Sequence, residues 1–351
     1  MKLIDVHDLL KMISIVGLRA LNQELFTALE EDFYHWEHFN KSNRHATHCD
    51  QGVIELMPCS SERYYTFKYV NGHPGNPARD KLSVVALGVL SEVDTGYPLL
   101  ISEMTLLTAL RTAAVAALGA RYLARKESSH LGLIGTGAQA EFLVEALRAV
   151  LPIEQVSYFD VDAAAMRKFA ANMHESGLRL HPKSAIYGAV EAADMVVTAT
   201  AAKRRASLLS RFQLQDGTHI HALGGDCPGK TELNPELVKQ CRRVVEYAGQ
   251  TRREGEIQNL PEIGIHAELW ELIRGVKSGR GNDHEITLFD AVGFALEDYS
   301  ALRVIYRLAD ELRIGRDVEL IPKLEKPKNL FGLMASPNML SIKSTTHRRV
   351  S

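Results

Sequence analysis

The feature that most constrains the fold of this chain is an apolar segment that leads into a glycine-containing turn and then into a helical pattern. In HLGLIGTGAQAEF, residues 130 to 142, the spacing Gly135-x-Gly137-x-x-Ala140 follows a predicted strand and precedes a predicted helix, as in a dinucleotide-binding fingerprint. Gly135 permits the tight turn, Gly137 lets the backbone approach a pyrophosphate, and Ala140 allows close helix packing. Because N–H groups at a helix start bind anionic phosphate, we expect a dinucleotide here. An ordinary strand-to-helix turn remains the alternative.

The next predicted strand, QVSYF, supports the cofactor interpretation. It ends just before Asp160, which lies 25 residues after Gly135. A carboxylate near this position binds the adenosine ribose hydroxyls and repels the 2′-phosphate of NADP. The sequence therefore predicts NAD as the cofactor.

Strands and helices alternate from residue 128 onward. Predicted helices over 138–150 and 162–175 lie among the segments HLGLIG, QVSYF, MVVTAT, THIHALGG, RRVVEY and EITLFDAVG. Such alternation is typical of βαβ units in a parallel sheet. We therefore predict an α/β fold whose central part, residues 116–314, is a Rossmann-like doubly wound domain that binds NAD.

The first part of the chain follows a different pattern. Residues 18–39 have helical periodicity, whereas 53–58, 64–70, 84–91 and 97–104 are short β-branched or aromatic runs separated by turns, which predicts antiparallel hairpins. Residues 105–124 predict a long buried helix with Thr105 as its N-cap. A helix over 293–315 should return the chain to this α+β domain, made of 1–115 and 315–351. The tail beyond Pro322 is polar and basic, as in a docked or partly disordered segment.

Composition excludes several classes of partner. The chain has 351 residues, a formal net charge of −2 and no long basic block before the C-terminus, so neither nucleic acid nor an anionic membrane is expected. Asp5, His7 and Asp8 interrupt the apolar run that a secretory signal needs, so we expect a cytoplasmic protein. The four cysteines lack disulfide-framework or metal-ligand spacing, so no metal site is predicted.

A second informative segment is THIHALGGDCPGKTEL, residues 218–233. Here a strand ends in Gly224-Gly225 and brings Asp226 and Lys230 to the carboxyl edge of the sheet, where open α/β sheets bind ligands. Asp226 is a candidate acid/base group for an amine, although a loop aspartate that caps a turn fits the spacing equally well.

Three cations in the first part of the chain are candidates for binding a carboxylate. Arg44 lies in KSNRHATH, Lys68 in the strand YTFKYV, and Arg111 in the early turns of the long helix. An inward-pointing lysine on a strand needs a partner. For any one of them alone, solvation or internal pairing is the ordinary explanation.

In this order, the segments IELMP, FKYVNGHP, ALRTAA, LIGTGAQAEF, GGDCPGKTEL, QTRREGEIQ and FDAVGFALEDY resemble the bacterial ornithine cyclodeaminases of the mu-crystallin superfamily, over residues 1–330. The resemblance implies a homodimer whose α+β domain binds substrate and dimerises. It implies NAD-mediated oxidation of L-ornithine, ring closure, loss of ammonia and re-reduction to L-proline.

The resemblance also implies roles for individual residues. The substrate carboxylate would be held by Arg44, Lys68 and Arg111, the side-chain amine would lie near Glu55, and Val292 would lie beside the substrate, with Asp226 as the acid/base group. The cofactor would be held by Ser83, Arg111, Gly135, Gly137, Ala138, Gln139, Asp160, Thr200, Leu223, Gly224, Gly225, Lys230 and Ala291.

Two positions depart from the family pattern. Ser83 replaces a threonine and keeps the hydroxyl, whereas Ala291 replaces a serine and loses a hydrogen bond to the cofactor, which contributes about 0.5 to 1.5 kcal/mol. The alternatives within the superfamily are lysine cyclodeaminase, cyclic ketimine reductase and an alanine-type dehydrogenase, because one methylene discriminates by only about 1 to 3 kcal/mol. A non-catalytic NAD- and ligand-binding protein is the alternative of another class; Asp226, Lys68 and Arg111 together argue against it.

Overall fold

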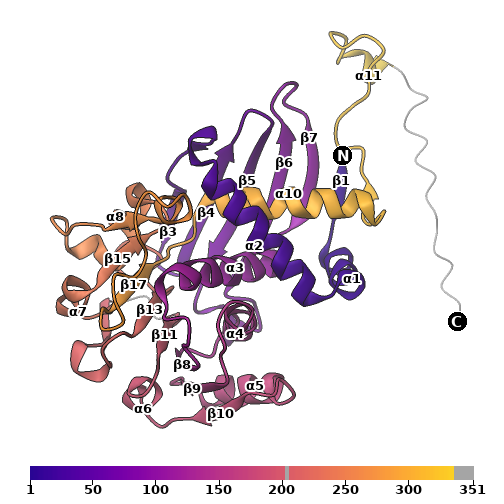
Figure 1. Cartoon of the computed structure of the whole chain (residues 1–351). Coiled ribbons are helices and arrows are strands. Elements are labelled where there is room, and N and C mark those ends of the chain that lie inside the picture. The colour runs from indigo at the N-terminus through magenta and orange to yellow at the C-terminus, as the bar shows by residue number, and fades with distance from the viewer. Residues whose placement is uncertain (202–204, 336–351) are drawn as a thin grey trace, which may run out of the picture.

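The computed structural model describes residues 1–201 and 205–335. These residues form two eight-stranded sheets and one two-stranded sheet, and a long helix, α3 (Thr105–Leu123), runs between the two large sheets (Figure 1). The arrangement confirms the predicted combination of an α+β part with a doubly wound part.

The first sheet contains the predicted hairpins. Strands β4 (Gly52–Ser60), β5 (Tyr64–Gly72), β6 (Val84–Glu92) and β7 (Pro98–Glu103) are consecutive antiparallel neighbours, as predicted. The sequence did not indicate the short strands that extend the sheet: β1 (Lys2–Ile4), β2 (Asn40–Lys41), β3 (His45–Cys49) and β18 (Arg316–Asp317). Strand β1 pairs in parallel with β7, and β18 adds to β1.

Helix α10 (Ala295–Glu311) packs on this sheet, and the long helix α2 (Leu18–Tyr34) packs on α10 and α3. Helix α2 confirms the amphipathic prediction, and α10 packs against α2 and against β4, β5 and β6 (Figure 1). Helix α1 (Val6–Val16) was not predicted, although Asp5 and Asp8 form a capping box at its start. Helix α10 therefore brings the end of the central region onto the first sheet.

The second sheet is entirely parallel. Its order is β10-β9-β8-β11-β13-β17-β15-β16, and the order reverses between β8 and β11, which confirms the doubly wound topology. The strands are β8 (His130–Ile134), β9 (Gln155–Phe159), β10 (Arg179–Pro182), β11 (Met195–Thr198), β13 (His219–Ala222), β15 (Arg242–Val245), β16 (Ala267–Glu268) and β17 (Thr287–Asp290). The small sheet pairs β12 (Arg205–Leu209) with β14 (Thr231–Leu233).

Short helices connect these strands. They are α4 (Ala140–Arg148), α5 (Ala163–Met173), α6 (Ile186–Val190), α7 (Pro235–Gln240), α8 (Ala248–Glu254) and α9 (Leu269–Ile273). Single turns of 3₁₀-helix lie at Trp36–His38, Asn76–Arg79, Arg211–Gln213 and Glu256–Asn259.

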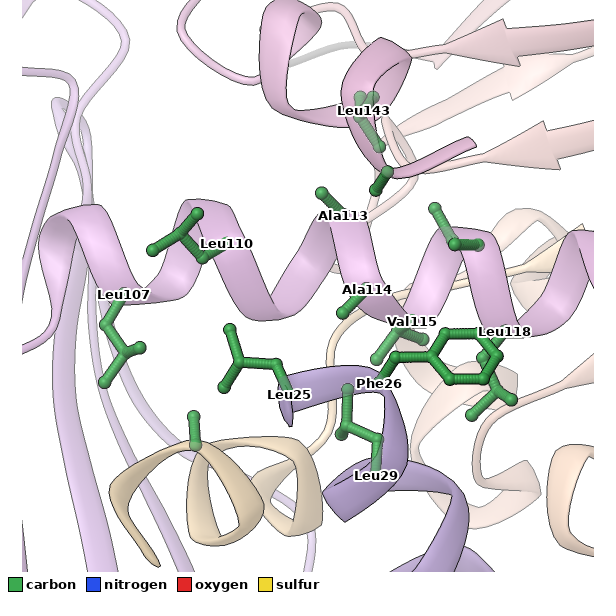
Figure 2. Close-up of a cluster of buried hydrophobic side chains, with 14 of the residues drawn as sticks. Leu25, Phe26, Leu29, Leu107, Leu110, Ala113, Ala114, Val115, Leu118 and Leu143 are labelled. Atoms are coloured by element: carbon green, nitrogen blue, oxygen red, sulfur yellow. The ribbon is translucent and has the colours of Figure 1, made fainter. Parts of the chain in front are cut away.

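Helix α3 is the core element that the two halves share. Its Ala114, Val115 and Leu118 lie on the side of α2, near Leu25, Phe26 and Leu29, whereas Ala113 points toward Leu143 of α4 (Figure 2). It is long and apolar enough to span a bilayer, but 78% of its most apolar window is buried inside the protein, as in the core helix of a globular protein.

The start of α3 corrects one prediction. Met104, not Thr105, is the N-cap residue, and its side chain makes no capping hydrogen bond. The Thr105 hydroxyl instead accepts from the backbone N–H of Ala86 at 3.0 Å, because β6 lies next to the helix start.

The domain boundaries at residues 115 and 314 remain a prediction. Helix α10 lies within the predicted NAD region but packs on the first sheet, which favours counting it with the substrate domain. In the tail, a short helix α11 (Gly332–Ala335) follows β18. The rest of the predicted tail, residues 336–351, lies outside the described residues.

Candidate active site

The turn between β8 and α4 has the geometry that a dinucleotide needs. Gly135 has φ +98°, and a Cβ there would lie 2.6 Å from the carbonyl oxygen of Ala199, so no other residue fits. Gly137 and Ala138 are exposed. Within the described chain, their N–H groups donate to no acceptor. Amides of this kind before a helix can bind a pyrophosphate.

Asp160 follows β9 and lies beside the same turn. Its Oδ2 accepts from Thr136 N at 2.7 Å and from Thr136 Oγ1 at 3.3 Å, while its Oδ1 accepts from Asp162 N at 2.9 Å. A carboxylate has about four lone-pair sites, so Asp160 can still accept from ribose hydroxyls. The predicted ribose-binding residue thus lies at the carboxyl edge of the sheet, next to the glycine turn.

The cofactor candidates at the ends of β11 and β13 are also linked. The ammonium of Lys230 donates to Thr200 O at 3.0 Å and lies 3.1 Å from Asp226 Oδ1. Thr200 N donates to Glu232 Oε1 at 3.0 Å. Burial raises the pKa of Glu232. Glu232 was not predicted as a site residue, although it stands in the quoted segment of residues 218–233.

The other three cofactor candidates, Ala291, Gln139 and Ser83, have fewer contacts with the rest of the site. Ala291 and Val292 follow β17 and are buried, and Ala291 N donates to Ala222 O at 3.0 Å. The buried Oε1 of Gln139 has no hydrogen-bond partner in the described residues. Ser83 stands just before β6, where its carbonyl oxygen accepts from His73 N. Among the described residues, no hydrogen bond or ion pair joins Ser83 to the other candidates, so its role stays a prediction.

Arg44 connects the two halves of the protein. It precedes β3, and its Nη1 donates to Glu55 Oε2 on β4 at 3.0 Å. Its Nη2 donates to the carbonyl oxygens of Val292 and Gly293 at 2.6 and 2.7 Å. Its Nε lies 3.0 Å from Glu254 Oε2 at the end of α8. Three of its five N–H groups therefore donate to protein oxygens, and a fourth, at Nε, contacts Glu254 without hydrogen-bond geometry.

Lys68 and Arg111 are held by two acids of α10. Lys68, with a side chain only 1% exposed, donates to Asp298 Oδ1 at 2.8 Å. Arg111 Nε lies 3.1 Å from the same oxygen, and Arg111 Nη1 bonds to Glu297. Burial and the Arg111 charge together lower the pKa of Lys68 to about 8. All three predicted carboxylate-binding cations are therefore internally paired, as buried charges must be.

Two of these cations keep spare donors. The ammonium of Lys68 has three N–H groups and one acceptor, and Arg111 Nη2 donates to no acceptor among the described residues. Lys68 and Arg111 can therefore add a substrate carboxylate to their existing pairs, whereas Arg44 has little hydrogen-bonding capacity left.

A second pair of buried acids lies behind Arg111. Glu246, after β15, accepts from the N–H groups of Val292 and Gly293 at 3.0 and 2.8 Å. Burial and the neighbouring Glu297 raise the pKa of Glu246 well above its ordinary value. Glu297 therefore favours the protonated form of Glu246, because two adjacent buried carboxyls do not readily ionise together.

Asp226 is the most accessible acid of the site. Its side chain is 50% exposed, and it interacts electrostatically with Arg44 and Glu254. The predicted substrate residues therefore form one connected group, with Asp226 at its open side.

The acids missed by the sequence analysis are Glu246, Glu254, Glu297 and Asp298. Three of them stand in segments quoted for the family resemblance, QTRREGEIQ and FALEDY. Glu297 and Asp298 lie in the first turn of a helix, where acids are ordinary because of the helix dipole. The sequence pattern therefore does not indicate that Glu297 and Asp298 are buried.

Comparison with known proteins identifies relatives of this chain. The family model described as the ornithine cyclodeaminase/mu-crystallin family matches residues 5–312. A curated ornithine cyclodeaminase from Agrobacterium tumefaciens (strain Ach5) is 45% identical over 331 residues, which cover 94% of this chain and 93% of that protein.

Two solved structures are similar over most of the chain. A lysine cyclodeaminase, described in a study of its recognition of L-lysine, L-ornithine and L-2,4-diaminobutyric acid, has a TM-score of 0.90 and 28% identity, covering 95% of this chain and 99% of that one. An archaeal alanine dehydrogenase dimer with bound NAD has a TM-score of 0.83 and 34% identity, covering 92% and 99%.

Proposed function

This chain belongs to the ornithine cyclodeaminase/mu-crystallin family, and from that premise we propose that it converts L-ornithine to L-proline and ammonia. The cofactor is NAD, which when bound accepts a hydride from Cα of the substrate and returns it before the product leaves. The similar archaeal enzyme binds NAD, and the exposed amides at Gly137 and Ala138 fit its pyrophosphate.

The balance of buried charge is the observation that carries the choice of substrate. Among the described residues of the pocket, the three cations face five buried carboxyls, namely Glu55, Glu246, Glu254, Glu297 and Asp298. The carboxyls outnumber the cations by two, so a proton held between Glu246 and Glu297 still leaves the pocket with more negative than positive charge. Ornithine, with two ammonium groups and one carboxylate, supplies the matching positive charge. A neutral amino acid such as alanine does not.

The pocket residues position both ends of this substrate. Lys68 and Arg111 hold the carboxylate with their spare N–H groups, and Arg44 adds its remaining donor. Glu55 binds the side-chain ammonium. Positioning of Cα in this way removes several kcal/mol of barrier from a hydride transfer. Asp226, at the open side, accepts a proton from an amine and donates one to the departing ammonia.

The cofactor is held along the carboxyl edge of the second sheet. Asp160 binds the ribose hydroxyls and disfavours NADP. Lys230 and Thr200 lie at the other end with Leu223, Gly224 and Gly225, and Ala291 and Val292 cover the site from β17. Ser83 and Gln139 make the remaining contacts with the cofactor.

Product identification tests the proposed function. Purified protein is incubated with NAD⁺ and L-ornithine, and products are identified by mass while absorbance at 340 nm is followed. We expect proline and ammonia in equal amounts without accumulation of NADH, because the hydride returns within one turnover. Stoichiometric growth of NADH with a free keto acid would identify a simple dehydrogenase instead.

Lysine is the competing substrate. The similarity to a lysine cyclodeaminase, with a TM-score of 0.90, favours including it, and one methylene discriminates by only about 1 to 3 kcal/mol. The same assay with lysine and alanine therefore ranks kcat/KM values. We expect ornithine above lysine and no reaction with alanine.

The protein acts as a cytoplasmic homodimer in this proposal. The face of the first sheet opposite α10 exposes apolar side chains from three strands, Ile54, Leu56, Tyr65, Val85 and Leu87, a pattern typical of an interface. The similar archaeal enzyme is a dimer. Light scattering is expected to show a dimer for wild type and monomer for Leu87→Glu; a monomeric wild type would contradict the proposal.

A further inference from the structure

Glu254 is a buried carboxyl of the pocket to which the proposal above assigns no proton transfer. Its side chain is 9% exposed, and its Oε2 lies 3.0 Å from Arg44 Nε. That contact is an ion pair without hydrogen-bond geometry, so the buried Oε2 accepts no hydrogen bond among the described residues. The carboxyl also interacts with Glu55 and Asp226. It therefore faces the same space as the residues assigned to the substrate amines.

The backbone after Glu254 fixes its position. Gly255 ends α8, and a Cβ there would lie 2.6 Å from a carboxylate oxygen of Asp290 and 2.4 Å from Cγ2 of Thr251. Gly255 N donates to Thr251 O at 2.7 Å. Asp290 in turn accepts from Glu256 N at 3.0 Å. The end of α8 is thus packed directly onto β17, which leaves the Glu254 side chain little choice of direction.

The chemistry of the proposed reaction requires two proton acceptors. Ornithine arrives with both amines protonated. The α-ammonium must lose a proton before Cα loses a hydride and becomes an imine, and the side-chain ammonium must lose another before its nitrogen attacks the imine carbon. One of the two protons later joins the departing ammonia, and the other joins the ring nitrogen of proline, so the balance closes.

Resting on the proposed function, we propose that Glu254 is the second acid/base group of the reaction and holds one of these two protons while Asp226 holds the other. The two amines of ornithine are separated by four carbon atoms, so one carboxyl cannot contact both at once. Glu254 and Asp226 approach the substrate from different elements, the end of α8 and the loop after β13.

The charged surroundings of Glu254 suit this role. Burial, together with the charges of Glu55 and Asp226, raises its pKa to about 7 against the lowering effect of Arg44 and, from its own helix, Arg253. A group with a pKa near the working pH both accepts and donates protons efficiently. A substrate carboxylate or ammonium that binds beside Arg44 also changes the pKa of Glu254.

The test is Glu254→Gln, which keeps the shape and an oxygen for Arg44 but cannot take a proton. We expect kcat for ornithine to fall about 10²-fold or more, with KM changed by only a few-fold. The acid limb of the kcat/KM pH profile near pH 7 should disappear. Glu254→Asp should restore part of the rate, and Glu236→Gln, an exposed acid of α7 paired with Lys239, should behave as wild type.

Each other outcome overturns the inference. If Glu254→Gln raises KM but leaves kcat and the pH limb unchanged, Glu254 only positions Arg44. If it changes nothing, Glu254 has no part in the reaction while the proposed function stands. A wild type that makes no proline from ornithine removes the proposed function itself. Infrared difference titration of the free enzyme, wild type minus Glu254→Gln, is expected to show a carboxyl that titrates near pH 7.

Discussion

Asp226→Asn separates an enzyme from a ligand-binding relative. The substitution keeps the size of the side chain and its oxygen toward Lys230, but the amide cannot accept a proton. General acid/base groups contribute about 10² to 10⁴ to a rate, which is about 2.7 to 5.4 kcal/mol of activation free energy at about 1.36 kcal/mol per tenfold. We expect kcat for proline formation to fall by that factor.

Stability should hardly change, because Asp226 is only loosely held. Its side chain is 50% exposed and pairs with Lys230 at 3.1 Å, and such a pair contributes about 0 to 1 kcal/mol. Lys230 keeps its bond to Thr200 O at 3.0 Å in the variant. The free energy of unfolding and the affinity for NAD⁺ are therefore expected to stay close to wild type.

The assay is steady-state formation of proline, with chemical unfolding and NAD⁺ titration on the same preparations. Asp216→Asn is the matched control, since Asp216 is 61% exposed and pairs with Arg211 away from the pocket; its kcat should equal that of wild type. Near-normal turnover in Asp226→Asn, with intact cofactor binding, would refute the acid/base assignment.

Three further predictions concern the cofactor, the substrate and pH. Asp160→Ser should bring the Kd values for NAD⁺ and NADP⁺ closer together in a fluorescence titration; equal Kd values in wild type would contradict its place at the ribose. Lys68→Met should raise the KM for ornithine at least about tenfold. It should destabilise the free protein by no more than about 3 kcal/mol, because Asp298 keeps Arg111 as a partner. An unchanged KM would exclude Lys68 from carboxylate binding. Burial and Asp290 raise the pKa of Glu256 to about 8 in the folded protein. The proton bound to Glu256 therefore stabilises the folded state fully below the unfolded-state pKa near 4.5. This stabilisation is lost as the pH rises toward 8. Unfolding free energies at several pH values should fall by up to about 1.4 kcal/mol per unit across this window, and the slope should be smaller in Glu256→Gln.

The sequence predicted the elements whose pattern is local. The turn at Gly135 and the strands β4 to β9 depend on periodicity and on backbone conformation, which neighbouring residues determine. Strands β1 and β18 have three and two residues, too short to show alternation, and they form only because the two ends of the chain meet beside β7. Their pairing is a product of tertiary packing.

The site was predictable to the extent that its residues stand in quoted motifs at the sheet edge. Asp226 and Lys230 follow a strand, so the topology determines where they lie. The partners of the cations were not predictable, because Asp298 contacts Lys68 across 230 residues of chain. Only the packing of α10 on β5 brings them together.

The pairing of Lys68 and Arg111 with acids of the protein itself affects how the substrate is recognised. Buried, unpaired Lys68 and Arg111 would be costly in the free protein, and Asp298 removes that cost by contacting both. A carboxylate that then binds their spare N–H groups meets Asp298 as a nearby like charge, so a carboxylate alone gains little. The ammonium groups of a diamino acid offset this repulsion at Glu55 and Glu254, at the Arg44 end of the same cluster. Recognition of the carboxylate is therefore coupled to recognition of the amines, and the pocket favours a molecule that carries both.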